Sequence, residues 1–176
     1  IEKIRNDDMD VGILATPLKE ADLTEIPLYY EPFVAYYPKG VTVQGPVELR
    51  NLDIRPDGEG RFEMILLGEE HCFRNQSLQI CNRRSISRIE CGSLDTLKEM
   101  VDLGAGMTLL PKLAAPKNDG RVVTLKDPQP SREISLIHGP YFYRHKLLTI
   151  VRDFILSHIP DDLKTKKGRS VIGIQV

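Results

Sequence analysis

The sequence lacks any apolar run approaching the roughly 18 residues of a membrane span, and it shows no secretory signal peptide. It also lacks a marked charge of either sign, since the formal net charge of its 176 residues is −1. We therefore expect no membrane association and no broad basic face for nucleic acid. Cysteine is scarce, and its odd count of three argues against a secreted disulfide framework and for a reducing, cytoplasmic location.

Repeats and low-complexity segments are also absent, so the organisation must be read from the hydrophobic pattern. A hydrophobic content of 41% can bury one core, or two small lobes that share a hinge. Short apolar runs predict strands at residues 11–15, 33–37, 64–67, 89–91, 107–110 and 134–137. Helices are expected over residues 73–81, 94–103 and 146–158, the last with an apolar face of Leu147, Ile150, Val151, Phe154 and Ile155. This alternation predicts an α/β fold with parallel pairing.

Cys72 directly precedes the helix expected over residues 73–81, and Cys81 is the last residue of that helix. Nine helical steps separate their α-carbons by about 13 Å and place the side chains on opposite faces. A disulfide needs α-carbons within roughly 7 Å, so helix and disulfide exclude each other. Oxidation would then unwind the segment. On spacing alone, two ordinary half-buried cysteines in a reduced protein are the simpler interpretation.

Cys72 is expected at the N-terminus of this helix, where exposed N–H groups stabilise a thiolate. His71 and Arg74 would add positive charge beside it, while Glu69 and Glu70 would act in the opposite direction unless they face solvent. Cys81 lies on the apolar side of the same segment and is expected to be sheltered until that segment opens.

Other chemistry at these residues has less support. His71, Cys72, Cys81 and Cys91 lack the paired spacings of a zinc site, so no metal is expected. A thiol hydrolase would need a base for Cys72, and only the adjacent His71 is available. Ser93 at the start of a helix is either a simple cap or part of a polar ligand cradle, and the cap is the preferred interpretation.

Three stretches carry a resemblance to a known family. The segment His-Cys-Phe-Arg-Asn-Gln at 71–76, with its second cysteine nine residues after the first, resembles the redox segment of the peroxide-sensing LysR-type transcriptional regulators. Residues 91–111 resemble the Ser-Leu-Glu-Thr-Leu, Gly-x-Gly and Leu-Leu-Pro pattern of the wider family. Residues 9–15 are similar to a strand of its effector domains. The likeness runs from about residue 1 to residue 158.

The resemblance implies two Rossmann-like α/β lobes resembling type II periplasmic binding proteins. Residues 1–34 and 133–176 would form the first lobe, and residues 35–132 the second lobe with all three cysteines. On this template we expect the first lobe to lack its N-terminal strand and helix, together with the threonines that help to hold peroxide.

The resemblance also implies a mechanism and site residues. Hydrogen peroxide would oxidise Cys72 to a sulfenic acid, and Cys81 would resolve it to a disulfide that remodels residues 72–81. His71, Arg74 and Asn75 would support the thiolate, with Asn75 standing where many relatives carry Asp. Arg132 matches an arginine near the family's redox loop, although a surface charge at the start of a strand is an equally good interpretation.

The expected partners follow from the same resemblance. DNA would be bound through an N-terminal helix-turn-helix, the protein would be a homodimer or tetramer, and a reductant such as glutaredoxin or thioredoxin would reset the switch. No cofactor is expected, and the domain would be a stoichiometric sensor rather than an enzyme. The alternative is a LysR-type effector domain that binds a small organic ligand between its lobes, with inert cysteines. A thiol peroxidase is disfavoured because no peroxidase motif is present.

Overall fold

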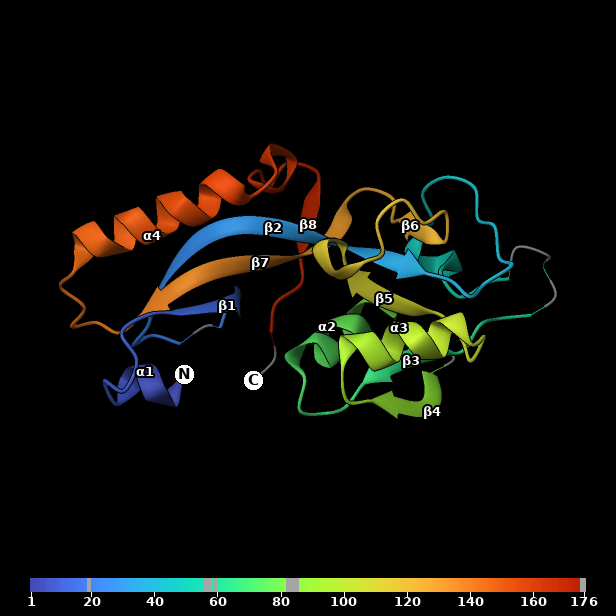
Figure 1. Cartoon of the computed structure of the whole chain (residues 1–176), viewed down its shortest axis with the longest axis horizontal. Coiled ribbons are helices and arrows are strands. Elements are labelled where there is room, and N and C mark those ends of the chain that lie inside the picture. Colours follow the sequence, from blue (N-terminus) through green and yellow to red (C-terminus); the bar gives the residue numbers. More distant parts are fainter. Residues whose placement is uncertain (19, 56–57, 59, 82–85, 175–176) are drawn as a thin grey trace.

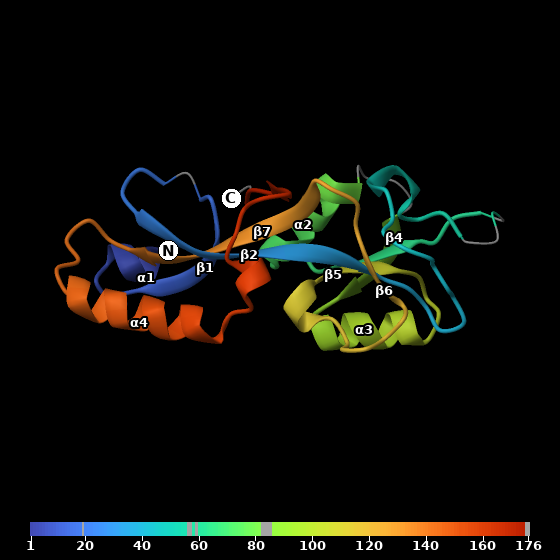
Figure 2. The same cartoon turned by 90° about the horizontal axis from the view of Figure 1, so that it is seen from above.

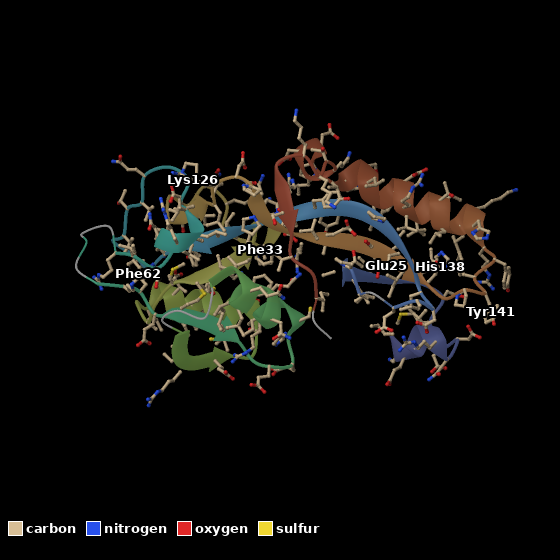
Figure 3. All side chains as sticks on the ribbon, turned by 180° about the vertical axis from the view of Figure 1, so that it is seen from behind. Glu25, Phe33, Phe62, Lys126, His138 and Tyr141 are labelled. Carbon is tan, nitrogen blue, oxygen red and sulfur yellow. The ribbon has the colours of Figure 1, made fainter. Side chains whose placement is uncertain are left out.

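Two long antiparallel strands, β2 (Thr24–Tyr36) and β7 (Gln129–His138), run through the molecule and connect two α/β lobes (Figure 1). This computed structural model describes residues 1–18, 20–55, 58, 60–81 and 86–174. Lobe I contains β1 and α4, and lobe II contains β3, β4, α2 and α3 (Figure 1). Glu25, His138 and Tyr141 lie in lobe I, whereas Phe62 and Lys126 lie in lobe II (Figure 3).

The remaining elements are short. The helices are α1 (Glu2–Arg5), α2 (Cys72–Cys81), α3 (Leu94–Asp102) and α4 (His145–His158), with 3-10 turns η1 (Leu49–Asn51), η2 (Lys112–Ala114) and η3 (Asp161–Leu163). The strands are β1 (Gly12–Thr16), β3 (Met64–Leu67), β4 (Ile86–Cys91), β5 (Thr108–Pro111), β6 (Val122–Thr124) and β8 (Arg169–Val171). None of the helices in the described ranges is both long and apolar enough to cross a membrane.

Lobe I is built on the antiparallel strands β1, β7 and β2, with α4 along one face (Figure 1). The helix predicted over residues 146–158 is confirmed as α4, but the sheet covers only part of the apolar face that was predicted for it. Of the predicted face, Val151 and Ile155 are half-buried, whereas Leu147, Ile150 and Phe154 are exposed. The buried residue of the helix is Leu148, which the prediction did not place on that face. The helix is apolar around more of its circumference than this sheet covers.

Lobe II has α2 and α3 on opposite sides of its strands (Figure 2). Strand β3 pairs in parallel with β4 and meets the chain just before β5 through a parallel bridge between Met64 and Met107. The predicted parallel pairing is therefore found, but β3 separates β4 from β5. Strands β5 and β6 both pair antiparallel with the end of β2, which gives lobe II a mixed sheet.

The largest core belongs to lobe II, where residues 33–37 of the predicted strand are all almost completely buried. The close approach of β3 to the turn before β5 requires glycine at position 106, because a Cβ there would lie 2.3 Å from the Glu63 carbonyl oxygen. Ser93 caps α3 as predicted, with its Oγ accepting a hydrogen bond from the Thr96 amide at 3.1 Å. These features fix the strand and helix that precede and follow the cysteine segment.

Candidate redox site

The cysteine segment is helical, as predicted, and α2 begins at Cys72 and ends at Cys81. Cys72 is exposed, whereas Cys81 and Cys91 are buried, and all three thiols are free. Nine residues of helix separate the α-carbons of Cys72 and Cys81 by about 13 Å along the axis. This conformation therefore keeps the two thiols from forming a disulfide.

The first turn of α2 is anchored to the protein through the two residues after Cys72. The Phe73 ring stacks on the Phe33 ring with centroids 5.4 Å apart, and Phe33 lies near the junction of the lobes (Figure 3). Arg74 forms an ion pair with Glu90 at 2.7 Å and donates a hydrogen bond to the Leu67 carbonyl at 2.8 Å. Arg74 thus ties α2 to the neighbouring strands, with its charge paired to a carboxylate.

The other predicted supporting residues on this segment lie near Cys72 along the chain. The His71 ring nitrogen Nε2 lies 3.1 Å from the Gly92 carbonyl oxygen and 3.4 Å from a Glu70 carboxylate oxygen. Asn75 is half-buried in the first turn of the helix. The proposed part of His71, Arg74 and Asn75 in supporting the thiolate stays a prediction.

Arg132 is brought to the start of α2 from β7. Its guanidinium carbon lies 6.0 Å from the centroid of the Phe73 ring, and its Nη2 lies 2.7 Å from the buried Glu31 carboxylate. Glu31, 1% exposed, also accepts a hydrogen bond from the Leu113 amide at 2.8 Å. The simple surface-charge interpretation of Arg132 is thereby disfavoured, because its partner is fully buried.

Glu31 was missed by the sequence interpretation. It stands between Tyr30 and Pro32 next to an apolar run that continues to Tyr37, and a charged residue in such a setting is rarely buried without a partner. That signal could have predicted a paired carboxylate, although its partner is 101 positions away in the sequence.

The last turn of α2 shelters Cys81. Its thiol donates to the Ser77 carbonyl at 2.7 Å and lies against the Met64 sulfur. Burial, with a smaller effect from the Asp53 carboxylate, raises the pKa of Cys81 to about 12. Burial also raises the pKa of Cys91. The exposed Cys72 is therefore the thiol that a soluble oxidant meets first.

We expect iodoacetamide at pH 8 to alkylate Cys72 in the folded, reduced protein well before Cys81. Burial raises the pKa of Cys81 to about 12, so very little of this thiol is ionised at pH 8, and the residue is out of reach of the reagent. Timed alkylation followed by peptide mass spectrometry measures the order. Equal labelling of both cysteines in the folded protein, with urea-unfolded protein as the reference, would contradict this assignment.

Two glutamines join α2 to the C-terminal segment of the chain. Gln76, fully buried, donates to the Ile172 carbonyl at 2.8 Å, and Gln79 donates to the Gly173 carbonyl at 3.2 Å. This segment follows β8, which pairs in parallel with β7 at the junction of the lobes (Figure 1). The C-terminal segment therefore supports the helix. The basic residues before β8, Lys164, Lys166 and Lys167, suggest a solvated terminus and give no sign of this contact.

Replacing Gln76 by Ala is expected to lower the free energy of unfolding of the reduced protein by about 1–3 kcal/mol, because the side chain is buried and the half-buried Ile172 carbonyl loses its donor. Urea unfolding in the presence of reductant measures the change. Gln44→Ala, at an exposed glutamine of the same lobe, is the control and should change stability by less than about 0.5 kcal/mol. Equal effects of the two substitutions would show that the hydrogen bond to Ile172 contributes little.

Within the described ranges, no three His, Cys, Asp or Glu side chains gather closely enough to hold a metal ion. Cys91 is the last residue of β4, two positions before the Ser93 cap, and it is buried in the core of lobe II.

Comparison with known proteins gives the geometry a context. The family model described as LysR substrate binding domain matches residues 1–160. Among curated relatives, the chain is 31% identical over 141 residues to a probable hydrogen peroxide-inducible genes activator of Mycobacterium leprae. It is 32% identical over 139 residues to the DNA-binding transcriptional dual regulator OxyR of Escherichia coli. These alignments cover 76% and 75% of this chain but 44% of each relative, so the chain spans less than half of their length.

Solved structures agree with this likeness. A mutant OxyR from Porphyromonas gingivalis superposes with a TM-score of 0.79 at 25% identity, covering 97% of this chain and 79% of that chain. The reduced OxyR regulatory domain from Pseudomonas aeruginosa superposes with a TM-score of 0.73 at 29% identity, covering 89% and 76%. The predicted fold class, two Rossmann-like lobes of the LysR effector type, is confirmed. The chain belongs to the LysR substrate-binding domain family.

Proposed function

We propose that this chain is the peroxide-sensing regulatory part of a LysR-type transcription regulator and that α2 is its redox switch. The observation that carries the proposal is the placement of an exposed thiol, Cys72, and a buried thiol, Cys81, at opposite ends of one helix. The two relatives, a probable hydrogen peroxide-inducible genes activator and the regulator OxyR, support the same function for the longer protein.

In the first step, the Cys72 thiolate attacks one oxygen of hydrogen peroxide. The O–O bond breaks, the second oxygen leaves as hydroxide and takes up a proton to form water, and Cys72 becomes a sulfenic acid. Cys72 is exposed at the start of α2, so peroxide can reach its sulfur. Arg74 and His71, which lie beside Cys72 along the chain, are the residues that we assign to support this step, together with Asn75 in the same turn and Arg132 beside the Phe73 ring.

In the second step, α2 unwinds and the Cys81 thiol, now exposed, attacks the Cys72 sulfur. The sulfenic oxygen leaves as a second water, so two thiols and one peroxide give one disulfide and two waters. Because the disulfide cannot span the intact helix, it holds residues 72–81 in a non-helical form. A dithiol reductant of the thioredoxin or glutaredoxin kind returns the thiols and allows the helix to reform.

The domain is a stoichiometric sensor in this proposal, and its output depends on the longer protein. Unwinding α2 would free the C-terminal segment from Gln76 and Gln79, and so alter the surface at the junction of the lobes. That change would alter how copies pair as homodimer or tetramer, and hence how an N-terminal helix-turn-helix binds DNA.

We also propose the residue boundaries of the two lobes. Residues 1–34 and 133–176 would form lobe I, and residues 35–132 would form lobe II. The pairing of β2 supports this division, because its first part pairs with β7 while residues 33–36 pair with β5. The change of partner falls between Pro32 and Phe33, two residues before the proposed boundary.

The test is non-reducing peptide mapping after addition of one equivalent of hydrogen peroxide. We expect a crosslinked pair of peptides containing Cys72 and Cys81, which dithiothreitol separates. If no crosslink forms and Cys72 reacts no faster than Cys91, the sensor proposal fails. A ligand-binding effector domain with inert cysteines would then be the function to test, by thermal stabilisation with small organic ligands in reductant.

A further inference from the structure

A cavity of about 300 Å³ lies beside the last turn of α2, at the end of the helix away from Cys72. Its walls come from η1 and the chain that follows it, from β3 and from residues 79–81 of α2. The apolar lining consists of Leu49, Leu52, Met64 and Ile80, with the buried Cys81 thiol beside them. This is a pocket of a size that suits a small organic molecule.

The cavity also contains a buried carboxylate that lacks one hydrogen bond. Asp53 lines it and is 6% exposed, and its Oδ1 accepts from the Arg61 guanidinium at 2.7 Å. Its second oxygen, Oδ2, has no hydrogen-bond partner among the residues that the structure describes. A buried carboxylate oxygen without a donor is costly, so the cavity favours a ligand that brings an N–H or O–H group.

The charged side chains at the mouth of the cavity, unlike Asp53, are exposed to solvent and pair with one another. Arg50 lines the rim and is exposed, and it forms an ion pair with Glu48, which also pairs with Lys126 at 3.0 Å. These groups face solvent and are screened by salt, whereas the Asp53 carboxylate is enclosed. The open acceptor on the enclosed Asp53 carboxylate therefore selects a ligand that donates a hydrogen bond, and a charged donor makes the stronger bond.

We propose that this cavity binds a small protonated amine with a compact apolar body, and that an occupied cavity holds α2 in its helical form. A branched five-carbon amine has six non-hydrogen atoms, which occupy about 180 Å³ at roughly 30 Å³ per atom and so fit the space. The ammonium group donates to Asp53, and the hydrocarbon packs on Leu52, Met64 and Ile80.

The coupling to the helix follows from the walls. The ligand contacts η1 on one side and the last turn of α2 on the other, so it binds only while that turn is folded. A ligand that binds one state alone shifts the equilibrium by the factor 1 + [L]/Kd. This second half of the inference rests on the proposed redox function, because Cys81 must leave this turn to reach Cys72.

Binding is tested first, on the reduced protein, with three probes that share one apolar body. These are 3-methylbutylamine, 3-methylbutan-1-ol and 3-methylbutanoate, measured by thermal unfolding and by ligand-observed NMR at neutral pH. The amine is expected to bind saturably and to raise the melting temperature. A Kd of about 1 mM is expected, an affinity that a ligand of six non-hydrogen atoms can reach. The alcohol should bind more weakly, and the carboxylate should not bind.

Two variants separate the cavity from other sites. Asp53→Asn should weaken the amine at least tenfold, while Asp153→Asn, at an exposed carboxylate of α4 in lobe I, should leave it unchanged. Leu49→Trp, at a rim residue that is 41% exposed, fills the mouth without removing the carboxylate and should also block the amine. Equal binding of all three probes, preferred binding of the carboxylate, or binding that survives both cavity variants would overturn the assignment.

The effect on the switch is measured separately. At ten times its Kd, the amine should slow peroxide-driven crosslinking of Cys72 to Cys81 by about tenfold in wild type and not in Leu49→Trp. An unchanged rate with saturated amine would overturn the coupling while leaving the binding site intact. If no crosslink forms at all, the redox function fails, and the binding measurements still decide whether the cavity takes an amine.

Discussion

Cys72→Ser protein is expected to form no Cys72–Cys81 crosslink, and the remaining thiols are expected to be oxidised by peroxide at least about 100-fold more slowly than Cys72 in wild type. Serine keeps the size and the start of the helix but removes the nucleophilic sulfur. Cys81 cannot replace it, because that thiol is buried and its pKa is about 12. Stopped-flow loss of peroxide, together with thiol counting, measures the rate.

Two further cysteine variants serve as controls for this experiment. Cys91→Ser should react like wild type, because Cys91 is buried in β4 and has no part in the proposed exchange. Cys81→Ser should still react at Cys72 but stop at the sulfenic acid, which dimedone traps. A Cys72→Ser protein that reacts at the wild-type rate would place peroxide chemistry at another residue.

Phe33→Ala should destabilise the reduced protein by about 3–5 kcal/mol, the usual cost of removing a buried phenylalanine from a packed core. Phe33 is 1% exposed and stacks on Phe73, the residue that follows Cys72. The substitution therefore also removes the support of the first turn of α2. Urea unfolding in reductant gives the free energy of unfolding, and far-ultraviolet circular dichroism of the folded variant reports the helix.

Phe154→Ala is the control, because this phenylalanine lies on the outer face of α4 and is 67% exposed. We expect a change of less than about 0.5 kcal/mol, as is usual for surface positions. If the two substitutions cost the same, lobe II is not the principal core, and the anchoring of α2 by the Phe33 ring would need another explanation.

Local sequence patterns were enough to predict much of lobe II. The strand over residues 64–67 and the helices on either side of Gly92 were found at nearly their observed bounds, because each combines an apolar pattern with a cap or turn signal. The positions of Cys72 and Cys81 at opposite ends of α2 also followed from spacing, since a helix of known rise fixes where two thiols lie. Their proposed redox chemistry came from the family resemblance and not from the spacing. These features depend on neighbours in the chain.

The remaining features depend on contacts between distant segments. Strand β2 was predicted only over its last residues, because its first part is half-buried and pairs with β7 about a hundred positions later. The Glu31–Arg132 pair and the support of Gln76 by Ile172 have no local signal. Helix α4 shows the same limit, since the pattern placed Leu147, Ile150 and Phe154 on the covered face, whereas the sheet packs on Leu148, Val151 and Ile155.

The central claim is that the disulfide and α2 exclude each other, and amide hydrogen exchange tests it most directly. In the reduced protein, amides in the last turns of α2 should be protected, with α3 (Leu94–Asp102) as the internal reference. After one equivalent of peroxide, we predict a Cys72–Cys81 crosslink and exchange at least about 100-fold faster across α2, with α3 unchanged. A crosslinked protein that keeps α2 as protected as before would contradict the claim, and a protein that forms no crosslink would contradict the proposed redox function.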